Sequence, residues 1–533
     1  MNALVDLWIS PDEYLFHIVE SDDLVLEQSE EAVWFQLVQS IFQNYQEFHA
    51  VAVHYYRCLF LFNQQATTSH RQRKKDRQPT DESKQEGRLR LLFDRPTAGN
   101  DDAPNLFPTI TPPEAPPLEN ENEIRPGKVP SRIAGRKPKD FYSMMAAFLG
   151  TQTMGMDATP ENVANNLTGN PSFARACNFT QPTPTSDSSS HVPRLRTLQQ
   201  FDQIMTENGL WSEAKNKIIT QNFNQQIIKP EKALVHDTTH HFAFSGFETV
   251  RYPDQNHKPC KKSQSHTSKT CTCDDKSSCP HSWELVDEGA GTVVKKHNVF
   301  HWAHKASIVG LPDQGVPLIA QAMTDAASHD SSSIIESISL LNQHFGQVVE
   351  IADDLLDDSA ADDPKLKAAL KNSFHMNLRC HVNPRRRKTL TSEDLPKAMS
   401  SLTPRGTLRC CAEHEMTYRC IREHIGYYYG PPVDDLQNHR CCECVFKVQC
   451  CHADNTNGRN VIIPFDKLPA ISKEDPPMAK KFQKVMKKRP SVERMIYRLK
   501  CTLGNRYLSK RGNQNYQASL DKAMLVFHLL LRQ

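Results

Sequence analysis

The sequence predicts an α/β fold that is preceded by all-helical segments. Residues 1–63 and 134–227 carry apolar side chains at helical spacing, whereas from residue 228 onward short apolar runs of strand length alternate with helical patterns. The chain has 533 residues, which is more than one typical domain contains. We therefore expect helical domains first and a mixed-sheet domain over residues 228–533.

The N-terminal half of the chain reads as two helical regions joined by a linker. The clusters AVWFQLVQSIF and AVAVHYYRCLFLF predict helices in residues 1–63. Residues 64–133 are charged, then rich in proline and acid, which predicts a disordered linker. Residues 134–227 combine short helical patterns with scattered Lys and Arg. This composition fits a DNA-binding helical domain, and a plain helical domain fits it equally well.

Strand patterns begin after residue 229. The segments ALVHDTTHHFAF, HNVFHWAHKASIVGL and VPLIAQAMT predict strands, and SSIIESISLLNQHF predicts a helix. GQVVEIADD predicts a buried strand that ends on acids, and RPSVERMIYRLK predicts a late helix opened by Pro490. Cysteine-rich insertions are expected at about residues 255–285 and 405–455.

The composition argues against a membrane protein. No apolar run is long enough to span a bilayer, and the N-terminus MNALVDLW lacks the zones of a signal peptide. We therefore expect a cytoplasmic protein, in which cysteines are more often metal ligands than disulfides. The formal net charge of +2 conceals an acidic run at residues 351–363 and a basic stretch near the C-terminus.

That basic stretch contains one carboxylate. Glu493 is the only acid between Met478 and Arg511, where its cationic neighbours are Lys480, Lys481, Lys484, Lys487, Lys488, Arg489, Arg494, Arg498, Lys500, Arg506 and Lys510. Solvated helix faces normally interleave both signs, so the pattern indicates a polyanionic partner and a distinct role for the acid. A basic helix with one intrahelical ion pair between Arg489 and Glu493 would also explain it.

Three carboxylates from distant segments form a candidate metal site. Asp237 follows the strand pattern ALVH, Asp353 follows VVEIA, and Glu493 lies on the late helix. Oxygen ligands of this kind suit Mg²⁺ or Mn²⁺, and two such ions roughly 3.5–4 Å apart catalyse phosphoryl transfer. Three other acids of the same run compete with Asp353 for its role: Asp354, Asp357 and Asp358.

With these residues the chain resembles the DDE transposases of bacterial insertion sequences, which have a ribonuclease H-like catalytic domain. The late helix of that family carries Tyr-x2-Arg-x3-Glu-x6-Lys, and Arg489, Glu493 and Lys500 fall at those spacings, with Met486 in the Tyr position. HDTTH resembles the surroundings of the family's first acid.

Two further segments resemble the family less closely. ADDLLDDS resembles the Asp-x-x-Tyr-Asp-Ser string around the second acid, with Leu356 in the Tyr position. WAHK resembles a Trp-Gly-x-Lys strand, with Ala303 replacing Gly and Lys305 as its lysine. The resemblance covers residues 135 to the end of the chain and leaves residues 1–134 outside it.

The resemblance implies a transposase that acts in the bacterial cytoplasm, at the nucleoid. Residues 135–226 would bind terminal inverted repeats, two Mg²⁺ ions would sit on Asp237, Asp353 and Glu493, and the enzyme would work as a dimer on DNA. The residues expected to contact DNA are Lys305, Arg489, Arg494 and Lys500. Two alternatives remain: a Mg²⁺-dependent nuclease of the same fold, and a catalytically degenerate, zinc-stabilised DNA-binding protein.

The cysteines predict a structural zinc site. Cys441-x2-Cys444-x5-Cys450 follows a tyrosine-rich segment, Cys410 lies upstream, and a Cys-x2-Cys pair presents two thiolates to one tetrahedral ion. Neighbouring candidates leave the ligand set open: Cys411, Cys442, Cys451 and His414. Buried free thiols are the alternative. A second cluster, between Cys260 and His281, is compatible with a metal or with a surface loop.

Overall fold

The computed structural model describes residues 33–76, 138–179, 191–243, 250–251, 284–285, 287, 289–295, 299–383, 395–403, 405–434, 440–441, 444–451, 455 and 457–532. The chain divides into two units, of which one comprises Met1–Tyr55 with Asp140–Gln533 and the other Tyr56–Lys139. The predicted metal cluster at residues 260–281 lies outside the described residues, as do residues 1–32 and 77–137 of the predicted N-terminal segments.

Helices fill the described part of the chain that precedes the sheet. They are α3 (Val33–Gln43), α4 (Tyr45–Asp76), α6 (Phe141–Thr153), α7 (Pro160–Gly169), α8 (Pro171–Ala176), α9 (Leu195–Glu207) and α10 (Leu210–Asn224). Helix α4 continues to Asp76, so the predicted linker is wrong for residues 64–76.

Thr159 caps α7 by accepting the backbone N–H of Asn162 at 3.2 Å, with Pro160 at the first helical position. Aromatic rings of Phe148, Phe201 and Trp211 pack together between α6, α9 and α10.

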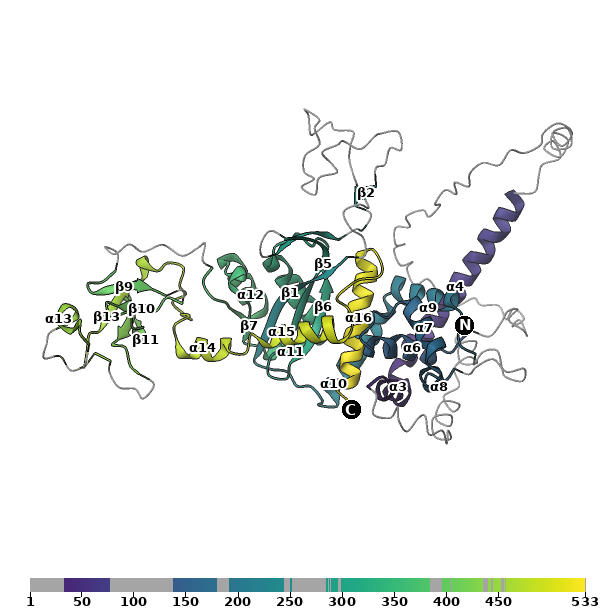
Figure 1. The fold of residues 1–533 in the computed structure, drawn as a ribbon, viewed down its shortest axis with the longest axis horizontal. Coiled ribbons are helices and arrows are strands. Elements are labelled where there is room, and N and C mark those ends of the chain that lie inside the picture. The colour runs from purple at the N-terminus through teal and green to yellow at the C-terminus, as the bar shows by residue number, and fades with distance from the viewer. Residues whose placement is uncertain are drawn as a thin grey trace, which may run out of the picture. The chain divides into compact units, whose positions relative to one another are not determined.

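A mixed sheet follows, which confirms the α/β class (Figure 1). Its central pair is β1 (Ala233–Phe242) and β5 (Val299–Leu311), which run antiparallel. The strands β4 (Gly291–Lys295) and β6 (Val316–Ala322) pair with β5. On the other side of β1 lie two parallel strands, β7 (Asp354–Leu356) and then β8 (Asn377–Arg379). The predicted neighbouring strands at residues 297–311 and 316–324 are therefore present.

The segment GQVVEIADD is not the strand that the sequence predicts. Helix α11 (Ile334–Ile351) continues through it, because Leu341, Phe345 and Val348 keep helical spacing and are buried. A kink at Phe345, where φ is −140° and ψ is 52°, divides the helix. The strand β7 begins only at Asp354, so the apolar run before the acids belongs to the helix.

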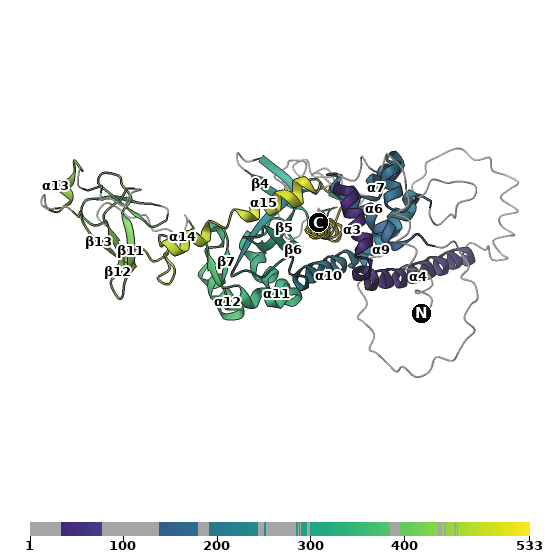
Figure 2. The same cartoon turned by 90° about the horizontal axis from the view of Figure 1, so that it is seen from below.

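Helices cover both faces of the sheet (Figure 2). Helices α11 and α12 (Pro364–Phe374) lie on one side, and α15 (Ser491–Tyr497) crosses the other. Gly310 of β5 permits this crossing, because a Cβ there would come within 2.5 Å of Sδ of Met495 in α15. The last helix, α16 (Asn513–Leu530), packs against β6 and α10. Within the described part of the chain, every helix is too short or too polar to span a lipid bilayer.

The region between β8 and α15 forms its own small core. Its strands are β9 (Met399–Leu402), β10 (Leu408–Cys410), β11 (Thr417–Arg422), β12 (Gly426–Gly430) and β13 (Val461–Pro464), with the short helix α13 (Lys447–Cys450). Tyr427 and Tyr429 are buried, and their hydroxyls donate to the carbonyls of Ile471 and Gly406 at 2.7 and 2.6 Å. The chain then returns to the sheet through α14 (Lys480–Met486).

Candidate active site on strand β1

Asp237 lies in the middle of β1, as the fifth of its ten residues, and not at a strand end as predicted. Its Oδ1 accepts the backbone N–H of Thr238 at 2.8 Å, and its Oδ2 accepts from Nη2 of Arg489 at 2.9 Å. The side chain is 22% exposed. Burial raises the pKa of Asp237 to about 6, against the opposing effect of the Arg489 guanidinium.

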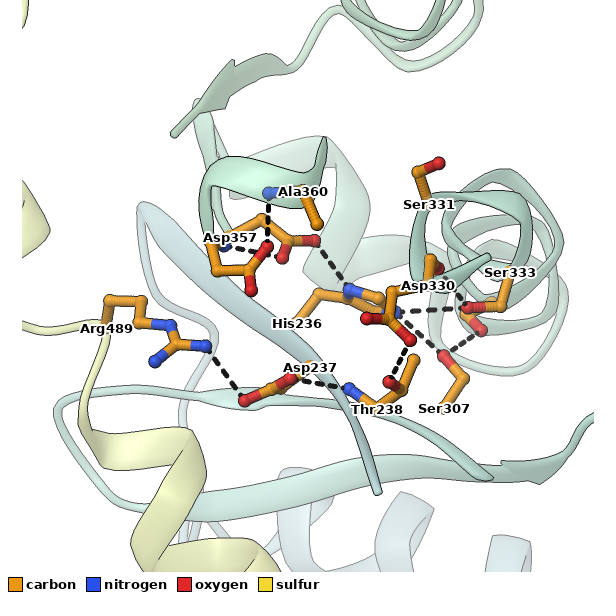
Figure 3. A network of polar contacts seen from close by, with 12 residues as sticks. His236, Asp237, Thr238, Ser307, Asp330, Ser331, Ser333, Asp357, Ala360 and Arg489 are labelled. Atoms are coloured by element: carbon orange, nitrogen blue, oxygen red, sulfur yellow. Dashed lines mark hydrogen bonds and ion pairs between the residues drawn. The ribbon is translucent and has the colours of Figure 1, made fainter. Parts of the chain in front are cut away.

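Arg489 connects Asp237 to Glu493. Its Nη1 donates to Oε1 of Glu493 at 2.6 Å. Its Nη2 donates to Asp237, the contact seen in Figure 3. The pair with Glu493 is the i, i+4 contact that the sequence predicts, although Arg489 itself precedes α15, and the contact with Asp237 is additional. Arg489 is 19% exposed and Glu493 is 61% exposed, so the carboxylate of Glu493 is accessible to solvent. One guanidinium thus brings together two of the three predicted acids.

Asp353 does not lie beside them. It precedes β7, where its backbone N–H donates to the carbonyl of Lys232 at 2.8 Å, and its side chain is exposed. Since β1 and β7 run parallel with Ala233 beside Asp354, Asp353 is roughly 16 Å from Asp237 along the strand direction. The prediction for Asp353 is wrong in this respect, because the strand that carries the acids starts after it.

Asp357, the first acid after β7, lies close enough to Asp237 to contribute to its raised pKa. The printed register ends at Val235 and Leu356, and if it is continued past the strand, Asp237 falls level with Asp358. His236 and Asp357 are hydrogen-bonded, Nδ1 to Oδ2, at 2.6 Å. Because side chains alternate along strands, the next pair lies on the opposite face, which is the face of Arg489. Asp358 is half-buried, and its Oδ1 accepts the N–H of Ala360 at 2.7 Å.

Side chains of β1 therefore divide into two faces, seen on either side of the strand in Figure 3. On the face toward α15, which we call the α15 face, Asp237 contacts Arg489 and Thr239 contacts Lys500. The opposite face lies toward α11, and we call it the α11 face. There His236 contacts Ser307 of β5 and Ser333 of the short helix η3 (Asp330–Ser333). The Thr238 hydroxyl donates to Asp330 of the same helix.

Lys305 belongs to the α11 face, since its register partner is His240. Its side chain is only 4% exposed, and Nζ contacts Oδ1 of Asp330 at 2.5 Å and the carbonyl of Ser328 at 2.6 Å. The ion pair holds the pKa of Asp330 below its ordinary value despite burial, which acts in the opposite sense. The structure thus buries the predicted DNA ligand Lys305 and pairs it with the partly exposed Asp330, on the face opposite Asp237.

The remaining predicted DNA ligands lie on or beside α15. Arg494 is exposed on the helix. Lys500 lies in a π-helical turn, Arg498–Thr502, and its Nζ donates to the carbonyl of His240 and approaches Oγ1 of Thr239 at 3.5 Å. The exposed cations of this region are Lys480, Lys481, Lys484, Lys487, Arg494, Arg498, Arg506 and Arg511. Lys488 and Lys510 form ion pairs with Asp313 and Asp202.

The predicted zinc ligands share one pocket of the inserted region. It is lined by Cys410, Cys441, Cys444 and Cys450, together with Cys411, Cys451 and His414. Burial and then the neighbouring thiols raise the pKa of Cys450 to about 11. The described cysteines form no disulfide. Among the described residues, no three Cys, His, Asp or Glu side chains stand together as a ready-made metal site.

The sequence pattern does not single out His236, and it favours Asp353 over Asp357 and Asp358, the acids that follow β7. The histidine directly precedes Asp237, and the doublet Asp357–Asp358 follows an apolar pair, Leu355–Leu356. Both are local signals. An apolar pair that runs into a doublet of acids marks the end of a short buried strand, and here it does so better than VVEIA.

Comparisons with known proteins do not assign the chain to a family. No protein-family model matches it, and no curated protein matches it. Among solved structures it is similar to the piggyBac transposase in a cryo-EM structure of the synaptic complex with hairpin DNA. The sequences are 9% identical, the match covers 75% of this chain and 68% of that chain, and the TM-score is 0.29. A TM-score of this size carries no inference about fold or activity.

Proposed function

We propose that this chain is a DNA transposase with a ribonuclease H-like catalytic domain, and that Asp237, Asp358 and Glu493 are its catalytic acids. The observation that carries the proposal is the single guanidinium of Arg489 that contacts both Asp237 and Glu493. These acids come from the central strand and from a helix that crosses it, and the acid doublet after β7 lies beside them.

The acids are of the chemical type that binds a divalent cation, although the described Asp237, Asp358 and Glu493 do not converge into a ready-made metal site. Carboxylate oxygens are the ligands that Mg²⁺ and Mn²⁺ prefer, and the cationic Arg489 already lies between two of them. A pair of bound Mg²⁺ ions supplies activation of a water or sugar hydroxyl and stabilisation of the leaving 3′ oxygen. Asp358 replaces Asp353 in this set because the register of β1 and β7, continued past Leu356, brings Asp358 level with Asp237, whereas Asp353 precedes the strand.

The surrounding residues have separate roles in this proposal. Arg489 can turn one Nη group toward a phosphate, since Glu493 is mostly exposed beside it. Arg494 and the other exposed cations of residues 480–511 hold the DNA backbone. Lys500 fixes the π-helical turn against β1 through its contact with the His240 carbonyl. Water attacks the terminal phosphodiester, and the freed 3′-hydroxyl then attacks target DNA.

DNA is the partner in this proposal. Helices α6–α10 within residues 135–226 recognise the terminal inverted repeats, and two copies act together on two DNA ends. Such a protein works at the bacterial nucleoid. Helices α7 and α9 are amphipathic with exposed polar faces, which is compatible with a DNA-facing surface.

The inserted region is proposed to hold structural Zn²⁺ through Cys410, Cys441, Cys444 and Cys450. The donor set fits, because these four thiols line one pocket in a region with a small core of its own. Metal analysis of the purified protein should find about one zinc per chain. Cys444→Ser should lose that zinc and lower the melting temperature, while Cys177→Ser, a buried cysteine of the helical region, should keep it.

The catalytic proposal is tested on a plasmid that carries the DNA flanking the coding region. The protein with Mg²⁺ should produce cleaved ends and joined products. Glu493→Gln should abolish cleavage and leave DNA affinity unchanged within about threefold, because the carboxylate is 61% exposed and a solvent-exposed i, i+4 ion pair contributes little to stability. Glu350→Gln, on the exposed side of α11, is the matched control and should keep full activity.

Three outcomes separate the alternatives. Hydrolysis without joined products identifies a nuclease. Intact DNA binding without cleavage by the unaltered protein identifies a degenerate, DNA-binding copy. Cleavage that persists in Glu493→Gln removes the catalytic assignment.

A further inference from the structure

Behind the proposed catalytic acids lies a second, buried pair. His236 precedes Asp237 and Asp357 precedes Asp358, and these two preceding residues are bonded to each other on the α11 face. Their side chains are 1% and 5% exposed. We call His236 and Asp357 the backing pair.

Both carboxylate oxygens of Asp357 are in use. Oδ2 accepts from Nδ1 of His236 at 2.6 Å, and Oδ1 accepts the backbone N–H of Asp358 at 2.6 Å. A carboxylate only accepts, so Nδ1 of His236 carries the hydrogen. Asp357 thus links His236, which directly precedes Asp237, to the backbone of Asp358.

His236 is itself held from the opposite side. Its Nε2 bonds Oγ of Ser307 in β5 at 2.9 Å, and that hydroxyl bonds Oγ of Ser337 in α11 at 2.7 Å (Figure 3). The hydroxyl of Ser333 lies at 3.4 Å from the same nitrogen and donates to the carbonyl of Asp330 at 3.0 Å. The imidazole therefore has a fixed orientation across β5, β1 and the end of β7.

We propose that the backing pair sets the spacing between Asp237 and Asp358 and thereby the affinity of the site for divalent cations. Both members act as positioning residues, because both are buried and each carboxylate oxygen of Asp357 already accepts a hydrogen bond from the chain. The structure around the pair supports this: β7 has only three residues, so few backbone hydrogen bonds tie Asp358 to β1. The inference rests on the proposed function of Asp237 and Asp358.

Two substitutions of His236 separate geometry from fold. Asn places its amide near the position of Nδ1, and Gln places its amide near the position of Nε2. His236→Asn should keep the bond to Asp357 and hold Mn²⁺ affinity within about threefold. His236→Gln should keep the bond to Ser307, lose the bond to Asp357, and weaken Mn²⁺ binding by about tenfold or more, as second-shell partners of metal ligands do.

The same logic distinguishes Asp357 from Asp358. Asp357→Asn can still accept the Asp358 N–H and donate to Nδ1 of the other histidine tautomer, so most of the Mn²⁺ affinity should remain. Asp357→Leu should lose about tenfold or more, and Asp358→Asn should abolish measurable binding. A larger loss in Asp357→Asn than in Asp358→Asn would make Asp357 the ligand and overturn the proposal.

Mn²⁺ binding is measured by calorimetry on the full-length protein, and unfolding is followed in parallel. His528→Asn is the control, since His528 is also fully buried and its Nε2 donates to the carbonyl of Pro317 at 2.8 Å, remote from the acids. It should lower stability and leave Mn²⁺ affinity unchanged. A parallel loss in His236→Gln and His528→Asn would reduce the backing pair to a structural role.

The result also separates this inference from the proposed function. Unchanged Mn²⁺ binding in both Asp237→Asn and Asp358→Asn means that the catalytic site is assigned wrongly. Loss of binding in those two variants with unchanged binding in His236→Gln leaves the catalytic site in place and overturns the backing pair alone.

Discussion

The two faces of β1 differ in what surrounds their polar side chains. On the α15 face, Asp237 pairs with Arg489, which also pairs with the exposed carboxylate of Glu493. The side chain of Asp237 is 22% exposed. On the α11 face, His236 is 1% exposed and is bonded at both ring nitrogens to Asp357 and Ser307. Adjacent residues of one strand thus enter an accessible charged cluster and a closed hydrogen-bond network.

The difference indicates that neighbouring residues of the strand have different roles. Buried polar groups that are fully bonded fix geometry, whereas a partly exposed group with a raised pKa is available for chemistry. The α11 network contains Ser307 of β5 and Ser337 of α11, which are both buried and bonded to each other. It therefore links the sheet to a helix behind the proposed site.

The largest expected effect is on the α15 face. Asp237→Asn should reduce cleavage at least about a thousandfold and leave the free energy of unfolding at neutral pH unchanged or slightly higher. Burial raises the pKa of Asp237 to about 6, so folding penalises its charged form. Urea unfolding at pH 8, with plasmid cleavage in parallel, measures both. A strong loss of stability in this variant would place Asp237 among the structural residues.

A smaller effect is expected at the far end of the same face. His241 is fully buried against Tyr516, with ring centroids 5.2 Å apart, and burial lowers its pKa to about 3. A depressed histidine pKa stabilises the fold above the unfolded value of 6.5, and this stability is lost as the pH falls toward 3.

His241→Phe should therefore make the protein less sensitive to acid. Between pH 7 and pH 4.5, the unaltered protein should lose about 2 kcal/mol more stability than the variant. Denaturant unfolding across this range measures the difference. His528 contributes to the same acid loss, since burial lowers its pKa to about 4, and it remains in both proteins as an internal reference. Equal slopes for the two proteins would contradict a buried neutral His241.

The sequence predicts the helix that carries Glu493 better than it predicts the second acid. Glu493 stands alone among cations, and its i, i+4 spacing from Arg489 is a local property that a short helix realises. The position of β7 is not local. VVEI is mostly apolar and suits either a helix or a strand, and the packing of Phe345 and Val348 in α11 decides for the helix.

The sequence also does not predict the contacts that side chains make across the sheet. Nothing near Arg489 in the chain indicates that its second Nη group reaches Asp237, and nothing near Lys305 indicates its partner Asp330. Both contacts depend on which face of a strand a side chain occupies. That follows from the register between β1 and β5, which a single strand pattern does not fix.

The smallest expected effect separates two cations for which the sequence predicts the same role. Arg494 is exposed on α15, whereas Lys305 is buried against Asp330 on the α11 face. Arg494→Ala should lower the slope of log affinity against log salt for DNA by about one. Lys305→Met keeps the apolar part of the side chain and should leave that slope unchanged. The free energy of unfolding should change by about 1 kcal/mol.

Fluorescence anisotropy with duplex DNA at several salt concentrations measures both slopes. Lys365→Met, an exposed lysine in the first turn of α12, controls for the loss of one positive charge outside the residues proposed to contact DNA. An equal fall in slope for Lys305→Met and Arg494→Ala would mean that Lys305 leaves Asp330 and reaches the phosphates when DNA binds. The two faces of β1 would then both contact DNA, and the α11 face could not serve only to fix the geometry of the acids.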